Sequence, residues 1–477
     1  MVSREGISAR PHWRLTVPRP PAALVHRFVV FTCTLLGLLG IGFVVLQLQA
    51  RGAILPMVAL CGITLGALIV IRPVIGLAAL VTCAIGVRVS VGTGSQSPLV
   101  ASLLCGCLLL VGWFVHRTLN RQRLNLLPSY VAVPAVLALA FTGFSLMWGR
   151  LTLDPRITYP ASFQRVQIAA TVLILVSVSL LFVCADLLRD RRVRTAIVSA
   201  MVVTGFLVLP FKALGTSVPG ANTAGLFGLW FIAICWANAL VNHRLHPVLR
   251  GLLATGAVGW LLMATIVEGK WVSGWLPGMV ALLLITLWAR PLFGIVLALL
   301  SSVLVSSYFS LVHDLVIVRQ REEGSLDGEF GRLALWQRNV DLLGDHLLLG
   351  TGPAGYAMYY ITFIPDRAMS THNNYFDMLA QTGVTGLLSF VGLMVALWVL
   401  ARRVLRHAKH AADRAVSLAV VGGVPAVAIS LFLGDWLLPF VYNQTIAGFD
   451  HSVYSWLMFA MVCGLYVQQR HGPPANA

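Results

Sequence analysis

Charged residues are scarce in this chain, and their scarcity excludes a soluble globular fold. Asp, Glu, Lys and Arg make up only 11% of the 477 residues, whereas hydrophobic residues make up 58%. A soluble domain usually carries about 25% charged residues. Because the apolar residues are spread over the whole length rather than gathered in one segment, the composition predicts a polytopic membrane protein.

Several motifs for nucleotides and metals are also absent. The sequence contains no Asp-x-Asp, no P-loop and no His-Glu-x-x-His, so we expect no nucleotide sugar, no catalytic metal and no cofactor. The eight cysteines lie in or beside apolar runs, which leaves none for a disulfide in an outer loop. Basic residues form no patch interleaved with exposed aromatics, so nucleic acid is not expected as a partner.

Apolar runs of roughly 20 residues, each long enough to cross a ~30 Å hydrocarbon core as a helix, recur from Leu24 to Val467. They predict an all-α polytopic membrane protein with about fourteen transmembrane helices. The predicted spans are approximately residues 24–48, 53–71, 73–91, 98–116, 129–148, 164–187, 195–211, 222–242, 251–268, 272–289, 292–312, 384–401, 415–434 and 451–467.

The positions of the cations predict how the chain is oriented. Most arginines and lysines fall in alternate connections, which places both termini in the cytoplasm. The net charge of +17 is therefore interpreted as a topology signal and an attraction to anionic lipid. The expected organisation is a basic tail at 1–23, spans one to eleven within 24–312, an extracytoplasmic loop at 313–375, spans twelve to fourteen within 376–467, and a second cytoplasmic tail at 468–477.

The loop 313–375 is the only large segment outside the predicted spans. Apolar residues recur in it at helical spacing, which predicts an amphipathic helix from about Ser325 to His346. Gly350 and Gly352 follow and are expected to end that helix. Further on, Gly383 and Gly386 are expected to permit a bend into span twelve.

Three cations fall on the predicted outer side, at membrane ends. They are Arg165 at the start of span six, Lys270 in the turn between spans nine and ten, and Arg332 on the outer helix. Together they suit a diphosphate, whose charge needs cations to hold it as a leaving group. Trp336, four residues after Arg332, can stack on its guanidinium. Topology or snorkelling remains an alternative for all three cations.

His372 lies between the outer loop and span twelve. If Thr371 is the N-cap of a short helix over 373–382, the helix N-terminus disfavours the imidazolium, and the neutral ring can accept a proton as a general base. Asn373, Asn374 and Tyr375 can orient the ring or bind sugar hydroxyls, or simply cap the helix. A solvated loop histidine is the alternative. The base would then be sought among the carboxylates Asp366, Asp377 and Asp435.

The order of these residues resembles the bacterial O-antigen ligase/polymerase family. The matching features are Arg332-x3-Trp336, Gly350-x-Gly352, His372-Asn-Asn-Tyr-Phe376 and Thr382-Gly-Val-Thr-Gly386. Two upstream segments match more weakly. Asn222 lies where the family has an Asn before a helix, and Gly269-Lys270-Trp271 departs from the family's Ser-Arg-Gly or Ser-Lys.

The resemblance implies an inverting, metal-independent glycosyltransferase with a glycosyltransferase-C-like bundle, active on the outer side of the bacterial cytoplasmic membrane. Its donor would be a glycan on a polyprenyl diphosphate, and its acceptor a glycan or glycolipid. His372 would take the proton of the acceptor hydroxyl, while Arg332, with Lys270 and Arg165, would hold the departing diphosphate. Polymerisation, ligation to a lipid and transfer to protein share these motifs.

A transporter or flippase for a lipid-linked glycan is the alternative from another class. Such a protein also carries charges at membrane ends, but it is expected to show paired inverted halves and helices broken near mid-membrane. This chain instead places its polar residues in one asymmetric outer loop. That asymmetry favours the enzyme.

Overall fold

The computed structural model describes most of the chain. The described residues are 54–86, 90–91, 99–121, 127–216, 218, 221, 223–268, 272–307, 332–363, 370–443 and 445–471. The chain divides into two units, residues 1–57 and 58–477, and the second contains nearly all of the described residues. The predicted first span at 24–48 and both tails lie outside the described residues, apart from 468–471.

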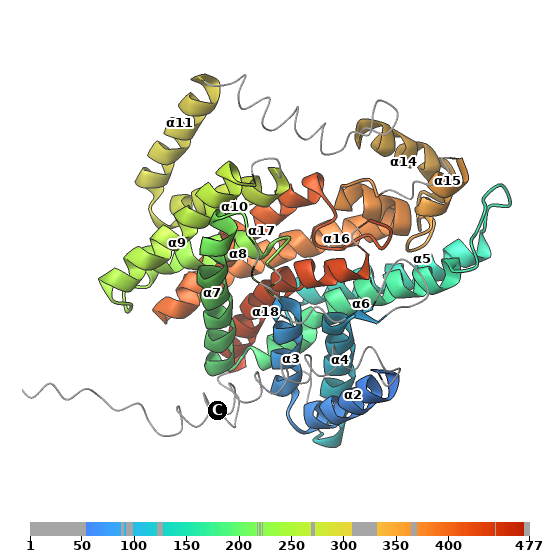
Figure 1. Cartoon of the computed structure of the whole chain (residues 1–477), viewed down its shortest axis with the longest axis horizontal. Coiled ribbons are helices and arrows are strands. Elements are labelled where there is room, and N and C mark those ends of the chain that lie inside the picture. Colours follow the sequence, from blue (N-terminus) through green and yellow to red (C-terminus); the bar gives the residue numbers. More distant parts are fainter. Residues whose placement is uncertain are drawn as a thin grey trace, which may run out of the picture. The chain divides into compact units, whose positions relative to one another are not determined.

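The described residues are almost entirely helical, which confirms the all-α prediction (Figure 1). The exception is a hairpin of two-residue strands, in which β1 (Ser90–Val91) pairs antiparallel with β2 (Leu99–Val100). The helices up to the outer loop are α2 (Ile54–Ile71), α3 (Pro73–Gly86), α4 (Ala101–Leu119), α5 (Ser129–Leu151), α6 (Phe163–Leu187), α7 (Arg191–Ala213), α8 (Phe227–Val241), α9 (Pro247–Ile266), α10 (Val272–Ala289) and α11 (Pro291–Ser307). Those after it are α14 (Arg332–His346), α15 (Tyr356–Phe363), α16 (Asn374–His407), α17 (Ala411–Leu433), the 3-10 helix η4 (Ile446–Gly448) and α18 (Phe449–His471).

Eight of the described helices are long and apolar enough to cross a membrane, and they are α4, α5, α6, α7, α9, α10, α16 and α17. Shorter apolar helices cover Cys61–Ile71, Pro73–Gly86, Phe227–Val241 and Pro291–Val303. This is a multi-pass membrane protein. The total of about fourteen spans stays a prediction.

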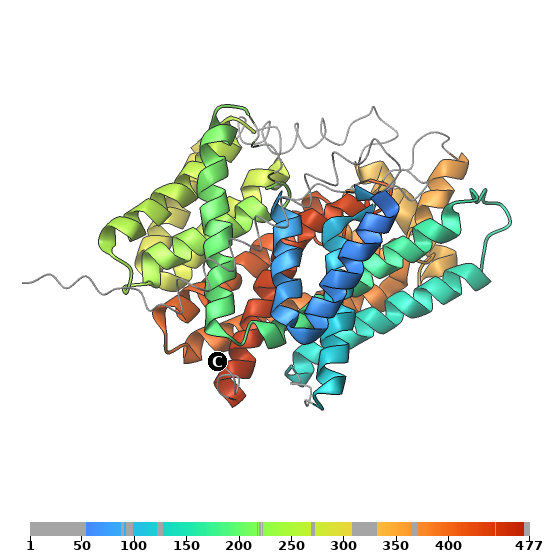
Figure 2. The ribbon, with the colours of Figure 1, turned by 60° about the horizontal axis from the view of Figure 1, so that its bottom comes forward.

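The C-terminal helix α18 packs against α6 and also contacts α16, α17, α8, α4 and α3. Figures 1 and 2 show it between the group α7 to α10 and the group α3 to α6. Its middle is buried on all sides: Trp456 and Phe459 are 0% exposed. The indole of Trp230 on α8 donates to the hydroxyl of Ser455 on α18 at 2.8 Å, which joins the two helices through a buried polar contact.

Buried polar pairs mark the two ends of the bundle. At one end Arg117 of α4 pairs with Asp186 of α6, and Arg194 of α7 pairs with Asp413 of α17 at 3.0 Å. At the opposite end of α4, Ser102 donates to Asp450 of α18. Charged groups removed from water need such partners, because an unpaired buried charge is strongly destabilising. The arginine end is the one that the cation distribution predicts to be cytoplasmic.

The expected bend after the outer loop lies at Gly383, which confirms that prediction for this residue. Its φ of 69° and ψ of −171° interrupt α16 between the turns at 374–382 and the long helix at 384–407. A Cβ at this position would lie 2.3 Å from the carbonyl of Leu348. Glycine is therefore required both by backbone conformation and by the close approach of a second chain segment.

We propose that the end bearing the connection 152–162 is extracytoplasmic and that the arginine end is cytoplasmic. Ala161 and Lys409 are exposed at these two ends. An impermeant maleimide should label Ala161→Cys in intact cells but should label Lys409→Cys only after permeabilisation. The unmodified protein controls for the native cysteines. The reverse labelling pattern would overturn the orientation.

Candidate active site

His372 lies in a short connection that α16 and α14 hold in place. Its φ of 50° is in the left-handed region, and its backbone N–H donates to the hydroxyl of Ser370 at 3.0 Å. Histidine tolerates this region better than most residues, but such a conformation persists only where neighbouring contacts fix it. The side chain of His372 is partly exposed.

The predicted N-cap is wrong by two residues. Asn373, not Thr371, caps α16: its side-chain oxygen accepts from the backbone N–H of Tyr375 at 2.9 Å and of Phe376 at 3.4 Å. The Thr371 hydroxyl makes other hydrogen bonds, because it lies 2.6 Å from Asp377 Oδ1 and 2.9 Å from the Asn373 carbonyl oxygen. His372 therefore directly precedes the N-cap.

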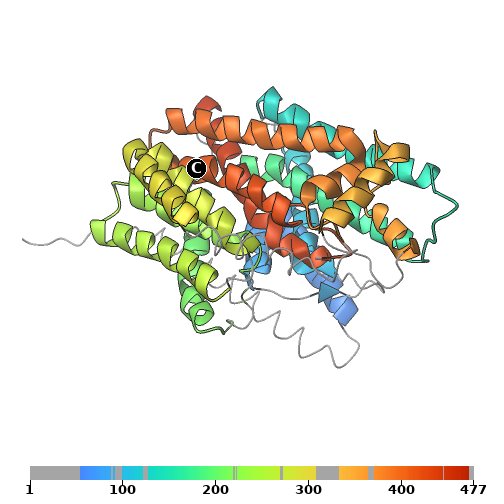
Figure 3. The ribbon, with the colours of Figure 1, turned by 90° about the horizontal axis from the view of Figure 1, so that it is seen from above.

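Trp336 of α14 contacts the histidine connection directly. Its indole N–H donates to the carbonyl of Thr371 at 2.9 Å, and its ring stacks on Phe376 with centroids 5.1 Å apart. Figure 3 shows α14 and α15 beside the first turns of α16. The expected partner of Trp336 was Arg332, whose side chain lies outside the described residues. What the structure places against Trp336 is the loop that carries His372.

Asn374 and Tyr375 make contacts within the protein. The amide of Asn374 accepts from the backbone N–H of Leu437 at 3.0 Å and of Leu438 at 3.2 Å, and it donates to the Leu438 carbonyl at 2.8 Å. The Tyr375 hydroxyl donates to the carbonyl of Ala428 at 2.9 Å, and its ring packs on Phe432. Both side chains thus join α16 to α17 and the segment after it, and sugar binding by them stays a prediction.

A buried carboxylate lies behind the histidine connection. Asp377 is 1% exposed, and its Oδ1 accepts from the hydroxyls of Thr371 at 2.6 Å and Tyr356 at 2.5 Å. Burial and this carboxylate raise the pKa of Tyr356 well above its ordinary value, so the phenol keeps its proton and donates it. Asp377 therefore anchors the loop from inside.

A second carboxylate reaches the histidine through an amide. Asn443 Nδ2 lies 3.1 Å from Asp435 Oδ1, 3.1 Å from Ser370 Oγ and 3.3 Å from His372 Nδ1. Asp435 is 0% exposed and also accepts from the backbone N–H of Phe440 at 3.0 Å. An amide nitrogen has two N–H bonds for these three acceptors. The longest contact, to the imidazole, is the one most readily exchanged.

The three predicted cations are not all within the described residues. Lys270 lies outside them, and so does Asn222 of the weaker upstream match. Of Arg332, only the position at the start of α14, one turn before Trp336, is described. Arg165 lies in the first turn of α6 with an exposed side chain. Of the suggested carboxylates, Asp377 and Asp435 both lie at the histidine connection, and Asp366 is outside the described residues.

The sequence motifs did not predict two polar residues of this site, Ser370 and Asn443. Asn443 is 71 positions from His372, and no spacing pattern connects them. A weak signal existed in the polar run Tyr442-Asn-Gln-Thr445, which precedes an apolar span. Gly350, Gly352 and Gly355 have the spacing of a dinucleotide-binding turn, but α14 precedes them where that function needs a strand.

The contacts of Asn374 predict that its main role is stability. Asn374→Ala removes three hydrogen bonds to the backbone of 437–438, each of which contributes about 0.5–1.5 kcal/mol. We expect the free energy of unfolding to fall by about 2–4 kcal/mol and the melting temperature in detergent to fall with it. Gln337→Ala, at an exposed position of α14, is the control and should melt like the parent. An unchanged melting temperature for Asn374→Ala would show that these bonds are not structural.

Comparison with protein families places part of this site within a known family model. Residues 252–391 match the family model described as O-antigen ligase. No curated protein matches the chain. The matched region runs from within α9 to the first turns after the bend in α16, so it includes Arg332, Trp336, the histidine connection and Gly383. Residues 252–391 of this membrane protein are thus similar to the O-antigen ligase model, and the match supports the resemblance to the O-antigen ligase/polymerase family that the sequence motifs indicate.

Proposed function

We propose that this protein is an inverting glycosyltransferase of the bacterial cytoplasmic membrane. It transfers a glycan from a polyprenyl diphosphate donor to a hydroxyl of a glycan or glycolipid acceptor on the extracytoplasmic side, without a metal ion. We favour polymerisation of repeat units over ligation of a finished chain. The observation that carries the proposal is the position of His372, inside the matched domain and partly exposed on a connection that Trp336 and Asn443 hold.

In this proposal the imidazole of His372 accepts the acceptor's proton. The amide of Asn443 donates toward Nδ1, which places the proton of the neutral ring on Nε2 and leaves a lone pair on Nδ1. An acceptor hydroxyl that replaces this 3.3 Å contact delivers its proton to Nδ1. Its oxygen then forms a bond to the anomeric carbon from the face opposite the diphosphate.

The carbon–oxygen bond to the diphosphate breaks in the same step, and the diphosphate leaves with the electron pair. Cations near the outer surface stabilise this charge. Arg332 is one helical turn from Trp336, whose indole touches the connection before His372, so the backbone positions of α14 suit a guanidinium close to the reacting bond. Lys270 and Arg165 are proposed as further diphosphate contacts.

A deletion strain tests the function as a whole. If the protein polymerises or ligates glycan, its loss should cause lipid-linked glycan to accumulate and the mature polymer to disappear. Purified protein with the accumulated lipid should then restore transfer in excess EDTA. A transporter would give the same accumulation but no transfer by the purified protein, and a requirement for added magnesium would contradict the metal-free mechanism.

His372→Gln should lose about 10²–10⁴-fold in the rate of transfer, because glutamine keeps hydrogen bonding but cannot accept the proton. Binding of the polyprenyl diphosphate donor should change little, since the imidazole acts on the acceptor. The wild-type rate should fall at acidic pH as the ring is protonated. A His372→Gln enzyme with normal turnover would reduce the histidine to a positioning residue.

Substitutions of Asn443 test whether the lone pair on His372 Nδ1 accepts the proton. Asn443→Asp puts a carboxylate beside the ring, which stabilises the imidazolium and holds a proton on Nδ1. The acid limb of the pH–rate profile should therefore move to higher pH, and activity should recover in alkaline buffer. Asn443→Ala is the matched control: it should slow transfer without moving the limb upward. An unshifted limb in Asn443→Asp would exclude contact between this position and the base.

A further inference from the structure

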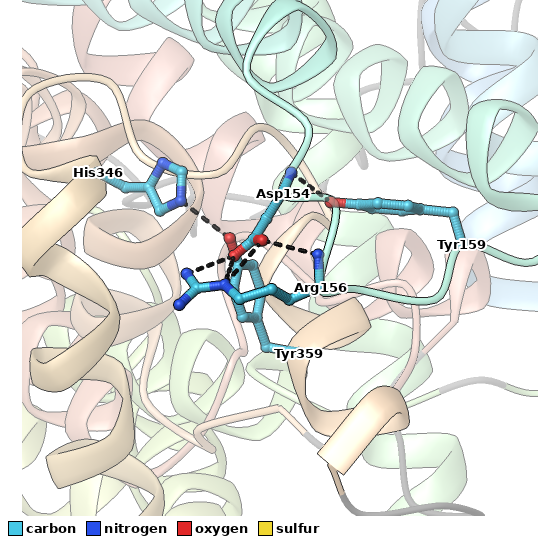
Figure 4. A network of polar contacts seen from close by, with 5 residues as sticks. All are labelled: Asp154, Arg156, Tyr159, His346 and Tyr359. Carbon is cyan, nitrogen blue, oxygen red and sulfur yellow. Dashed lines mark hydrogen bonds and ion pairs between the residues drawn. The ribbon is translucent and has the colours of Figure 1, made fainter.

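One arginine near the end of α16 has no anionic partner among the described residues. Arg402 lies little more than one turn before the last residue of that helix, and it makes no hydrogen bond or ion pair with the described part of the chain. The carboxylate in the first turn of α17, Asp413, pairs with Arg194 at 3.0 Å. At the opposite end of the bundle, Arg156 binds Asp154 through two nitrogens, at 2.7 and 3.0 Å (Figure 4). Unlike these two arginines, Arg402 keeps an uncompensated charge.

Two indole rings hold the guanidinium of Arg402. Its Cζ lies 4.5 Å from the ring centroid of Trp398, one turn earlier on α16, and 5.0 Å from that of Trp288, the last residue but one of α10. The indole N–H of Trp398 donates to the carbonyl of Val421 on α17 at 3.2 Å, which ties this ring to a second helix. Cation–π contacts position a guanidinium but leave its N–H groups without acceptors, and Arg402 Nε is buried without a partner.

Trp288 adds a further hydrogen-bond donor at the same place. Its side chain is 41% exposed, and its indole N–H has no partner among the described residues. Arg402 and Trp288 therefore present one cation and several N–H donors with no acceptor. A planar guanidinium can bind two oxygens of a phosphate group at once, so an anionic phosphate group suits these donors.

An apolar stripe leads along α16 to Arg402. Val395 and Val399 are 56% and 43% exposed, and they precede Arg402 by seven and three residues, so the three side chains share one face of the helix. An anionic phospholipid has acyl chains for the valines and a phosphate for the guanidinium. Free phosphate or an acidic peptide would match only the cation. Tryptophan is also enriched at the level of lipid headgroups.

This place is remote from the histidine connection. Beyond the bend at Gly383, α16 runs without interruption from Val384 past Arg402. At a rise of ~1.5 Å per residue, these two positions are about 27 Å apart, which approaches the ~30 Å thickness of a hydrocarbon core. A ligand of Arg402 is therefore distinct from the diphosphate proposed to react at His372.

We propose that Arg402 and Trp288 bind the phosphate of one anionic phospholipid, whose acyl chains lie along Val395 and Val399. The lipid belongs to the leaflet at the arginine end of the bundle, and the proposal does not depend on the transfer reaction. The phosphate neutralises the guanidinium and accepts from the indole N–H. Because one contact comes from α16 and the other from α10, the bound lipid stabilises the packing of these helices.

Lipid binding by the full-length protein in neutral detergent tests this site. The probes are phosphatidylglycerol and phosphatidylcholine with identical acyl chains, and native mass spectrometry measures how much of each is bound. We expect wild type to prefer phosphatidylglycerol, and Arg402→Gln to lose about tenfold in affinity for it, as for the loss of one charge-assisted contact. Arg403→Gln removes the same charge from the exposed neighbouring position and is the matched control, which should bind like wild type.

A second pair of variants does not alter the charge. Trp288→Ala removes one ring and its N–H donor, and Trp148→Ala, whose parent side chain is also 41% exposed, is its control. Phosphatidylglycerol should raise the melting temperature of wild type and Trp148→Ala by more than that of Trp288→Ala.

Three results would overturn the lipid site. Wild type that binds both lipids equally has no headgroup preference. Equal losses in Arg402→Gln and Arg403→Gln would indicate attraction by overall charge rather than a site. Displacement of phosphatidylglycerol by an equal concentration of inorganic phosphate would show a site for a free anion.

Discussion

Hydrogen bonds exchanged around Gly383 join α16, which follows the histidine connection, to the turn after α14. The bend removes the helical partners of several backbone groups in α16, and an unpaired buried group is costly. The turn after α14 replaces them: Val384 N donates to the Leu347 carbonyl at 2.9 Å, and Thr351 N donates to the Ala380 carbonyl at 2.9 Å. The turn after α14 is thereby joined to α16 through backbone atoms.

The same turn also packs against α5. Ser145 of α5 donates to the Gln381 carbonyl, and a Cβ on Gly149 would lie 2.4 Å from the Thr351 carbonyl. A Cβ on Gly350 would come within 2.5 Å of Gln381. Since α5, the turn and α16 approach this closely, α5 and the turn support the part of α16 that follows the histidine connection.

The sequence predicted the features that depend on neighbouring residues and missed those that depend on residues far apart in the chain. Hydropathy placed most helices, and glycine predicted both the bend at 383 and the end of α14 near 346, because these features follow from nearby residues. The N-cap was misplaced because both Thr371 and Asn373 are common N-cap residues, and the sequence does not show that the Thr371 hydroxyl binds Asp377 instead. Asn443 could not be found, since its link to His372 exists only after α17 and α18 are packed.

The contacts of Asn374 constrain how this sequence can change. Its amide bonds only to backbone atoms of 437 and 438, which every residue except proline supplies alike. The side chains at 437 and 438 are thus free of this constraint, whereas position 374 must keep a group that both donates and accepts at this reach. As far as this contact is concerned, related sequences can replace the side chains at 437 and 438 while they keep Asn374. Position 374 and positions 437 and 438 therefore need not vary together, although they are in contact.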